Sequence, residues 1–463
     1  MSVGPVPDSP RTPRFLTRPI GPLFVSTVLP MAVVLSMGGL MTAIDGIFVG
    51  RLVGAEALAA VSLAFPVVML LTALSVLVGG GMASLLARRL GAGQRQAAGA
   101  SFAGAHGLAL AISLALIVAA LFAGPAVLAV LSAGNDAVTG LAEEYLLVLI
   151  LGTPAQFALG LHADALRSEG RAGLVAGLSV LVNLLNIGAN YIAIVPLGLG
   201  VAGSALGTVA AQTLGLALLI GVRARDGDLL PLSALRQASW LKGWPQMLAL
   251  GLPLCLSFVG MALVASTVLL LLGTATEQAS LVAAYGVVTR ILGLAFLPQM
   301  AIALTTQSIT GINAGADRMD RAQAALRLAI GTAFGWCILV ALAGQFAGAA
   351  FGALFSDDPA IVTAVAAILR PMTALYWLSG PILVLALYFQ AMGHPLRTAL
   401  LTLVKPWLLT PVLLVLMTLT GGKDGLWFAF PVADGIMLVI ALAMLRRIAD
   451  IAPVVATRTE EAT

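Results

Sequence analysis

The sequence predicts an all-α integral membrane protein with twelve transmembrane helices, arranged as two six-helix lobes that are related by a pseudo-two-fold axis along the membrane normal. Three observations predict this fold class. Of the 463 residues, 60% are hydrophobic and 10% are charged. Apolar runs of about 20 residues, the length that crosses a bilayer as a helix, recur along the chain. The two halves of the chain also match each other at a nearly constant offset.

The low charge content argues against a soluble fold, because an ordinary soluble chain carries roughly 25% charged residues. A transmembrane barrel would show stretches of roughly ten residues in which apolar and polar side chains alternate. The segment 108–121 is instead apolar on every helical face. The formal net charge of +4 comes from basic residues scattered among short loops. Membrane topology explains this scatter, and we therefore expect no nucleic-acid partner.

Apolar runs between charged or glycine- and proline-containing breaks give the expected spans. The N-terminal lobe is expected over 23–222, with spans at 23–50, 57–86, 97–131, 138–165, 171–195 and 200–222. The C-terminal lobe is expected over 246–445, with spans at 246–273, 280–310, 322–355, 360–390, 396–419 and 424–445. A cytoplasmic linker, 223–245, joins the lobes, and cytoplasmic tails are expected at 1–22 and 446–463.

The internal repeat has an offset of 222 to 223 residues. It pairs Leu29-Pro30 with Leu252-Pro253, Gly93 with Gly315, Gly170 with Gly393, and Gly203 with Gly425. Because each repeat has six spans, an even number, both repeats enter the membrane from the same side. Transporters built from such repeats bind substrate between them and alternate access by rocking one against the other.

Arginine and lysine in the loops set the expected orientation. If the N-terminus is cytoplasmic, the outer segments hold only Arg51 and Lys423, and the inner segments hold the other loop cations. The positive-inside rule then places both termini in the cytoplasm. We therefore expect a multi-pass protein of the cell (inner) membrane.

Asp45 is a charged side chain inside the first span, where an ionisable group is costly and calls for a partner or a function. It lies six residues before Arg51, roughly 9 Å from the outer end of the span at the helical rise per residue. One interpretation is a site that couples transport to a cation. The alternative is an interfacial ion pair with Arg51.

Asp434 is a second such carboxylate, inside the twelfth span. Three cations, Arg290, Arg370 and Lys405, lie within spans of the same lobe. These four residues form a candidate C-lobe site, and a structural ion pair is an equally good interpretation.

Amides and hydroxyls add a second pattern. Asn186 and Asn190 lie one helical turn apart on the fifth span and therefore point the same way. Tyr145 on the fourth span, Thr208 on the sixth and Asn190 all lie in the outer half of the membrane. With Asp45 they could line one polar chamber, or they could form ordinary interhelical hydrogen bonds.

Several classes of site are not predicted. The three histidines, His106, His162 and His394, are far apart in sequence and lack metal-ligand spacing. The chain also lacks a glycine-rich phosphate loop ending in Lys-Ser/Thr. Prolines within or at the edges of many spans predict kinked helices that could line a cavity. We expect no cofactor, no metal and no catalytic residue, and energy from an ion gradient or a partner.

Several longer motifs resemble the multidrug and toxic compound extrusion (MATE) transporters, in the branch with the DinF-like and MepA-like proteins. They are Ile44 to Arg51 followed by Ala59 to Pro66, Ala284 to Arg290 leading into Phe296 to Gln299, and Gln307 to Ala316. The resemblance covers almost the whole chain. It implies a twelve-helix, two-lobe protein that exports amphipathic, often cationic, drugs in exchange for protons or sodium ions.

The resemblance also implies roles for individual residues. Asp45 matches the aspartate of the family's first helix, and Pro30 matches the kink of that helix. Tyr145, Asn186 and Thr208 match members of the polar network around the aspartate. Asn190 departs from the pattern, because many relatives have an aspartate there, and a single carboxylate then remains in the N-lobe chamber.

One buried carboxylate can couple transport to protons when its surroundings bring its pKa toward neutral. A sodium site is equally constructible, since carboxylate, amide and hydroxyl oxygens are ligands of hard cations. The sequence leaves the ion open. An alternative function is a flippase or exporter of a lipid-linked or anionic amphipathic metabolite. A membrane enzyme would need convergent acids, histidines or a metal cluster, and the sequence shows none of these. We expect drug-like substrates and membrane lipids as partners, and a monomer.

Overall fold

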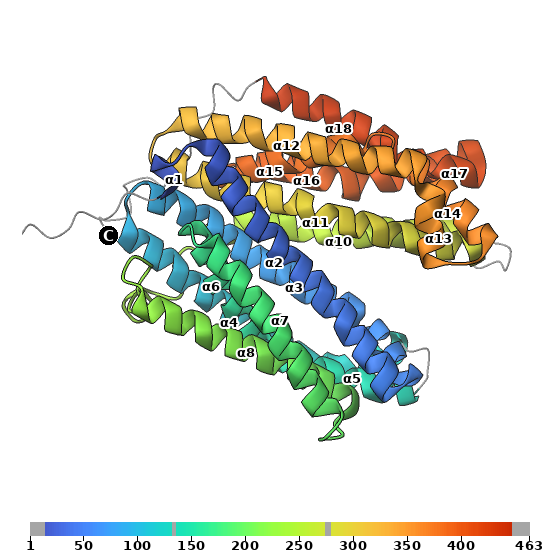
Figure 1. Ribbon diagram of the computed structural model, residues 1–463, viewed down its shortest axis with the longest axis horizontal. Helices are drawn as coiled ribbons and strands as arrows, with labels where there is room; N and C mark the ends of the chain where they lie inside the picture. Colours follow the sequence, from blue (N-terminus) through green and yellow to red (C-terminus); the bar gives the residue numbers. More distant parts are fainter. Residues whose placement is uncertain (1–13, 132–135, 274–278, 447–463) are drawn as a thin grey trace, which may run out of the picture.

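The computed structural model describes residues 14–131, 136–273 and 279–446, and every regular element within them is a helix (Figure 1). Most of the two expected tails lies outside the described residues. The N-terminal lobe comprises α2 (Ile20–Phe48), η1 (Val49–Val53), α3 (Ala55–Gly91), α4 (Arg95–Leu131), α5 (Asp136–Leu151), α6 (Thr153–Ser168), α7 (Ala172–Ile194) and α8 (Gly200–Arg225). A short helix, α1 (Arg14–Thr17), precedes α2.

The C-terminal lobe follows a linker that contains the short helix α9 (Ala234–Gln237). It comprises α10 (Trp244–Leu272), α11 (Ala279–Gly315), α12 (Met319–Phe346), α13 (Gly348–Phe355), α14 (Pro359–Thr373), η3 (Tyr376–Leu378), α15 (Ser379–Ala391), α16 (Pro395–Leu403), η4 (Val404–Leu409), α17 (Thr410–Leu426) and α18 (Ala429–Leu445). The elements η1 and η4 are π-helical turns, and η3 is a 3₁₀ turn.

The described residues supply the twelve expected spans. Nine helical segments are long and apolar enough to cross a membrane. Two bent pairs, α5 with α6 and η3–α15 with α14, each add one span with a bend of 48°. We assign as the twelfth the shorter apolar helix α18, whose 17 residues are at the lower limit of bilayer-spanning length. The predicted all-α fold class is therefore confirmed.

The structure breaks four spans that we expected to be continuous. The span 360–390 is divided between α14 and η3–α15, with a bend of 48°. The span 322–355 ends at Phe346, and α13 then turns so that Gly348 and Gly352 pack against the backbone of α14. The span 396–419 contains the π-turn η4, in which Pro406 has no N–H to donate within the helix. The span 138–165 bends between α5 and α6, where Pro154 begins the second helix.

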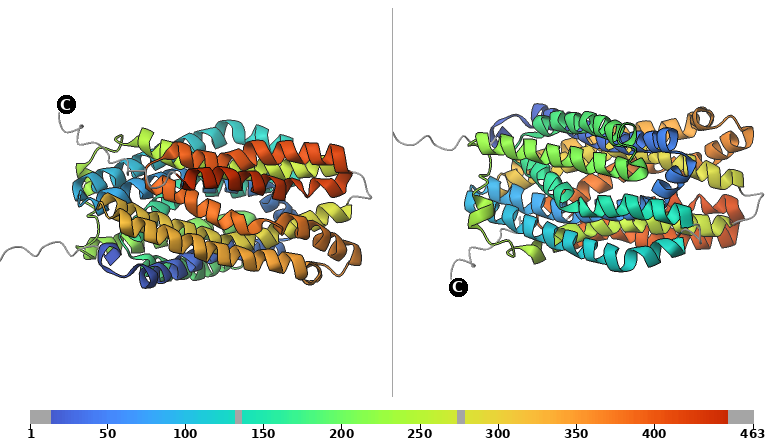
Figure 2. Two further views of the ribbon diagram at one scale, coloured as in Figure 1. Left: turned by 90° about the horizontal axis from the view of Figure 1, so that it is seen from above. Right: turned by 90° about the horizontal axis from the view of Figure 1, so that it is seen from below.

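The two lobes meet at one end of the molecule and diverge toward the other (Figure 1). We call the first end the linker end, because the linker between α8 and α10 lies there (Figure 2). Contacts between the lobes run chiefly from α3 to α10 and α11, and from α2 to α11. These pairings obey the internal repeat, which relates α2 to α10 and α3 to α11.

Glycines allow the helices of the two lobes to touch through their backbones. A Cβ atom added to any of four glycines would clash with a carbonyl of the other lobe: Gly81 with Met247, Gly91 with Ile312, Gly251 with Leu77, and Gly315 with Arg88. Small residues at helix crossings are a common device of membrane proteins, because the backbones can then approach closely. This glycine seam holds the lobes together near the linker end.

Candidate functional site

The candidate site is a buried polar chamber between α2, α7 and α8 in the N-terminal lobe. Asp45 of α2 is 8% exposed. Its Oδ1 accepts a hydrogen bond from Nδ2 of Asn190 on α7, at 2.6 Å. Its Oδ2 accepts one from Oγ1 of Thr208 on α8, at 3.3 Å. Three helices that are distant in sequence therefore converge on one carboxylate.

Asn186 links the other two polar residues. Its Nδ2 donates to Oγ1 of Thr208 at 3.0 Å, and its Oδ1 accepts from Nδ2 of Asn190 at 3.4 Å. Asn186 and Asn190 are each at most 1% exposed. The helical spacing of the two asparagines puts both side chains on the face of α7 that meets α2 and α8.

Close packing of α7 against α8 makes this chamber compact. Gly207 of α8 lies directly against Asn190, and a Cβ atom at that position would clash with the amide oxygen and backbone of Asn190. Gly203 approaches the carbonyl of Ala193 in the same way, at 3.1 Å for an added Cβ. These glycines let a polar amide fill the space that a side chain would otherwise occupy.

Asp45 receives only neutral donors. Among the described residues, no basic side chain lies within ion-pair distance of Asp45. Arg51, six residues further on, is exposed in η1. The alternative of an interfacial Asp45–Arg51 ion pair is therefore not what the structure contains.

Tyr145 and Pro30 are the other predicted N-lobe residues, and Asn183 is a further amide on α7. Tyr145 of α5 is 7% exposed and belongs to a hydrophobic cluster that also contains Val49 and Ala205. Pro30 lies inside α2, which continues through it. Asn183, two turns before Asn190, donates to the carbonyl of Ser179 and takes no part in the contacts to Asp45.

The C-lobe candidates divide into a pair and two separate cations. Nζ of Lys405 in η4 contacts Oδ1 of Asp434 in α18, and both residues thereby satisfy their charge inside the lobe. The side chain of Asp434 is 4% exposed and that of Lys405 is 31% exposed. Arg290 and Arg370 are exposed, and no contact joins them to the pair in the described part of the chain.

Sequence reasoning missed a polar group on α11 and its neighbours. Oε1 of Gln299 accepts from the hydroxyl of Tyr376 at 3.2 Å, and its Nε2 donates to Oγ of Ser379 at 3.0 Å. Helix α18, which carries Asp434, packs against the turn η3 that carries Tyr376. Gln299 belongs to the motif Phe296 to Gln299, but its partners lie about 80 residues away along the chain. The spacing of polar residues within one helix therefore did not indicate these contacts.

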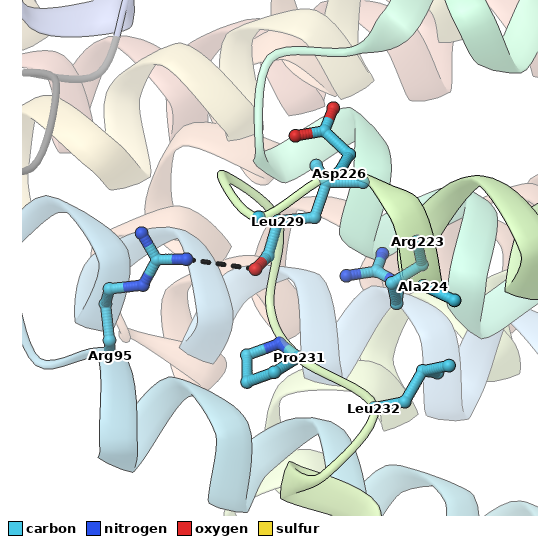
Figure 3. A pocket seen from close by; sticks show the side chains of 8 residues that line it. Arg95, Arg223, Ala224, Asp226, Leu229, Pro231 and Leu232 are labelled. Atoms are coloured by element: carbon cyan, nitrogen blue, oxygen red, sulfur yellow. Dashed lines mark hydrogen bonds between the residues drawn. The ribbon is translucent and has the colours of Figure 1, made fainter.

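A cavity of about 410 Å³ lies at the linker end, between the start of α4 and the end of α8 (Figure 3). Its cations are already engaged. Arg95 donates to the carbonyl of Leu229 at 2.9 Å, and Arg223 forms a bidentate pair with Glu169 at 2.9 and 3.0 Å. The bond of Arg95 fastens the linker to α4, and the Arg223–Glu169 pair joins α8 to the end of α6, so we assign both a structural role.

The chain is similar in sequence to known proteins over most of its length. The MatE family model matches residues 30–192 and 253–416, which together make more than half of the chain and one segment in each lobe. An FAD transporter of Shewanella oneidensis is 25% identical over 460 residues, with 96% of this chain and 98% of the relative covered. The multidrug export protein MepA of Staphylococcus haemolyticus is 25% identical over 408 residues, with 86% and 87% covered.

Two solved structures share the fold over nearly their whole length. One is an outward-facing multidrug resistance transporter of the MATE family, with a TM-score of 0.86 and 26% identity over 95% of this chain and 98% of that one. The other is a MOP superfamily transporter from Pyrococcus furiosus, whose binding pocket of reverse polarity was taken to suggest a different function. Its TM-score is 0.86 and its identity 25%, with the same coverage.

Proposed function

Because the chain belongs to the MATE family of multidrug transporters, we propose that it exports amphipathic, cationic compounds in antiport with protons, by alternating access between its two lobes. The observation that carries the proposal is the buried Asp45, which receives hydrogen bonds from Asn190 and Thr208 and has no basic partner among the described residues. An ionisable residue within a membrane span is rare and costly, so it marks a candidate functional site by default.

The chamber suits a proton because its groups can change roles without moving far. The ionised carboxylate accepts from the amide of Asn190 and the hydroxyl of Thr208. Once protonated, Asp45 can donate to the oxygen of Thr208, since a hydroxyl both donates and accepts. A proton and a cationic substrate then compete for one negative charge. This competition is the simplest basis for exchange.

The driving force is adequate. One-to-one exchange of a proton for a monovalent cation moves no net charge, so the pH difference drives it, and each pH unit, about 1.4 kcal/mol, supports a tenfold substrate gradient. Sodium is the alternative coupling ion. It prefers oxygen ligands, so Asn190 would have to turn its amide oxygen toward the carboxylate, where its nitrogen now lies.

We place the linker end in the cytoplasm, with the protein in the inner membrane as a monomer. The loop cations at the linker end support this orientation by the positive-inside rule. The lobes diverge at the opposite end, which agrees with the likeness to an outward-facing relative.

The test is transport by the purified protein in liposomes. A fluorescent lipophilic cation is added without an imposed gradient of its own. The liposomes carry a pH gradient, a sodium gradient or neither. Proton antiport predicts uptake or release driven by the pH gradient and abolished by an uncoupler. If the dye moves only under a sodium gradient, sodium and not the proton is the coupling ion. If the dye moves with neither gradient, its transport is not coupled to an ion.

A second candidate function is export of an anionic amphipathic metabolite or a lipid-linked one. Two observations favour it: a relative that aligns over nearly the whole chain is an FAD transporter, and the exposed Arg290 and Arg370 of the C-terminal lobe form no ion pair within the described residues. FAD loaded into the same liposomes tests it. Efflux of FAD without movement of the cation would favour this candidate over drug export.

A further inference from the structure

The short helix α1 crosses from one lobe to the other at the linker end, although its position before the first span predicts only a tail. Phe15 of α1 is 2% exposed, in a segment of four helical residues. Its ring belongs to a hydrophobic cluster that is otherwise formed largely by α11, α12 and α15 of the C-terminal lobe. Figure 1 shows α1 where the two lobes meet.

The backbone of this segment is bonded to the C-terminal lobe. The carbonyl oxygen of Phe15 accepts from Nδ2 of Asn313 at 3.3 Å and from Nη2 of Arg321 at 3.1 Å. The same Nη2 donates to the carbonyl of Arg18 at 2.6 Å, and Nε of Arg321 donates to Oδ1 of Asn313 at 3.0 Å. One guanidinium therefore binds two carbonyls of the N-terminal segment, those of Phe15 and Arg18.

The Phe15 ring also contacts the N-terminal lobe. Gly170, in the turn between α6 and α7, has a φ of +82°, and a Cβ atom there would lie 2.9 Å from a ring carbon of Phe15. The absence of a side chain at Gly170 makes room for the ring. Because α1 also continues through Arg18 and Pro19 into α2, the segment is covalently part of one lobe and anchored on the other.

We propose that α1 is a latch that holds the two lobes together at the linker end. The ring of Phe15 supplies its apolar contacts, and the guanidinium of Arg321 supplies its hydrogen bonds. The inference rests on the alternating-access cycle of the proposed function. Opening the linker end requires α11 and α12 to move away from the turn at Gly170. Either the ring of Phe15 must then separate from Gly170, or the ring and the carbonyls of Phe15 and Arg18 must separate from the C-terminal lobe.

Spin-label distances measure the latch directly and do not depend on any substrate. One pair of labels, at Gln96→Cys and Asp320→Cys, reports the linker end, because both residues are exposed and lie at the starts of α4 and α12. A second pair, at Ala137→Cys and Ala360→Cys, reports the opposite end. The two native cysteines, Cys255 and Cys337, are buried and are replaced by alanine in this background.

In this background Phe15→Ala is expected to raise the ratio of linker-end-open to linker-end-closed molecules by about tenfold, since a buried phenylalanine loses most of its apolar contact area. The linker-end distance should lengthen while the distance at the opposite end shortens. Arg321→Gln should shift both distances in the same direction, and Phe15→Leu should shift them less. Thr17→Ala is the matched control, because Thr17 lies on the same helix and is exposed.

Unchanged distances in both Phe15→Ala and Arg321→Gln would overturn the latch. The result is separable from the proposed function. If the distances shift but no cation is transported, the latch stands and drug antiport fails. If transport is present and proton-driven while the distances do not respond, drug antiport stands and the latch fails.

Discussion

Asn190 donates its amide N–H to Oδ1 of Asp45 at 2.6 Å, across 145 residues of sequence. This contact fixes the side chain of the first helix against the fifth span of the same lobe. It also defines what a change at either position should do. An amide at 190 stabilises the ionised carboxylate as a neutral donor, whereas an acid there would add a second negative charge to the chamber.

Asp45→Asn removes the titratable group and keeps the size and hydrogen-bonding capacity of the side chain. Proton-driven export should fall to the level of liposomes without protein, because no other carboxylate joins the contacts among Asp45, Asn186, Asn190 and Thr208. The measurement is dye transport under an imposed pH gradient, with protein content matched by immunoblot. Asp320→Asn is the control, since that carboxylate is 73% exposed. Full transport by Asp45→Asn would rule out the coupling role.

Asn190→Asp places a second carboxylate within hydrogen-bond distance of Asp45. Two like charges at such a distance disfavour the doubly ionised state, so the chamber should keep a proton at higher pH. We expect the alkaline limb of the transport profile to move upward by on the order of one pH unit. Transport is measured in steps of pH with a constant gradient. Asn183→Asp, on the same helix but bonded to Ser179, should leave that limb in place. Equal profiles for both variants would contradict the chamber as we describe it.

Arg88→Ala should weaken the closed linker end independently of the latch. Nη1 of Arg88 donates to the carbonyls of Ala391 and Gln390, at 2.7 and 3.3 Å, at the end of α15. A cation is favourable at a helix C-terminus, where carbonyls lack helical donors. The linker-end spin-label distance should therefore lengthen in Arg88→Ala and less in Arg88→Lys. Arg89→Ala is the comparison, because the bonds of Arg89 to Ala97 and Ser101 lie within the N-terminal lobe. A longer distance in Arg89→Ala alone would refute this assignment.

Lys405→Ala leaves Asp434 as an unpaired carboxylate in the C-terminal lobe. Breaking a buried ion pair from one side typically costs about 3 to 5 kcal/mol, and the partial exposure of Lys405 should bring the loss toward the lower figure. The melting temperature in detergent should fall by several degrees. The double variant Lys405→Met with Asp434→Leu should recover much of the loss, because it removes both charges. A double variant less stable than Lys405→Ala would show that the pair does more than neutralise itself.

Reporter fusions test the orientation. Fusions at Gln94 and Asp228, on the linker side, should read cytoplasmic, and fusions at Gly198 and Asp357 should read external. The measured quantity is the ratio of a periplasm-active to a cytoplasm-active reporter. An external reading at Asp228 would contradict the six-plus-six arrangement, since this residue lies in the linker between the repeats.

Much of the fold follows from local sequence alone. Apolar runs of bilayer length must satisfy their backbone hydrogen bonds within the segment, which leaves the helix as the only solution in each run. The repeat offset adds the two-lobe architecture. The same locality made Asp45 conspicuous, since a carboxylate in an apolar run is rare, and it put Asn186 and Asn190 on one helical face.

Other features depend on which helices become neighbours, and no local pattern encodes that. Lys405 pairs with Asp434 while Arg290 and Arg370 stay exposed, although all three cations looked equivalent in sequence. Phe15 is buried because α11 and the turn at Gly170 close on it from different lobes. Composition and period therefore determined the helices and the unusual charges. Only the tertiary packing of helices decided the partners, because a side chain's contacts come from other helices, tens to hundreds of residues away along the chain.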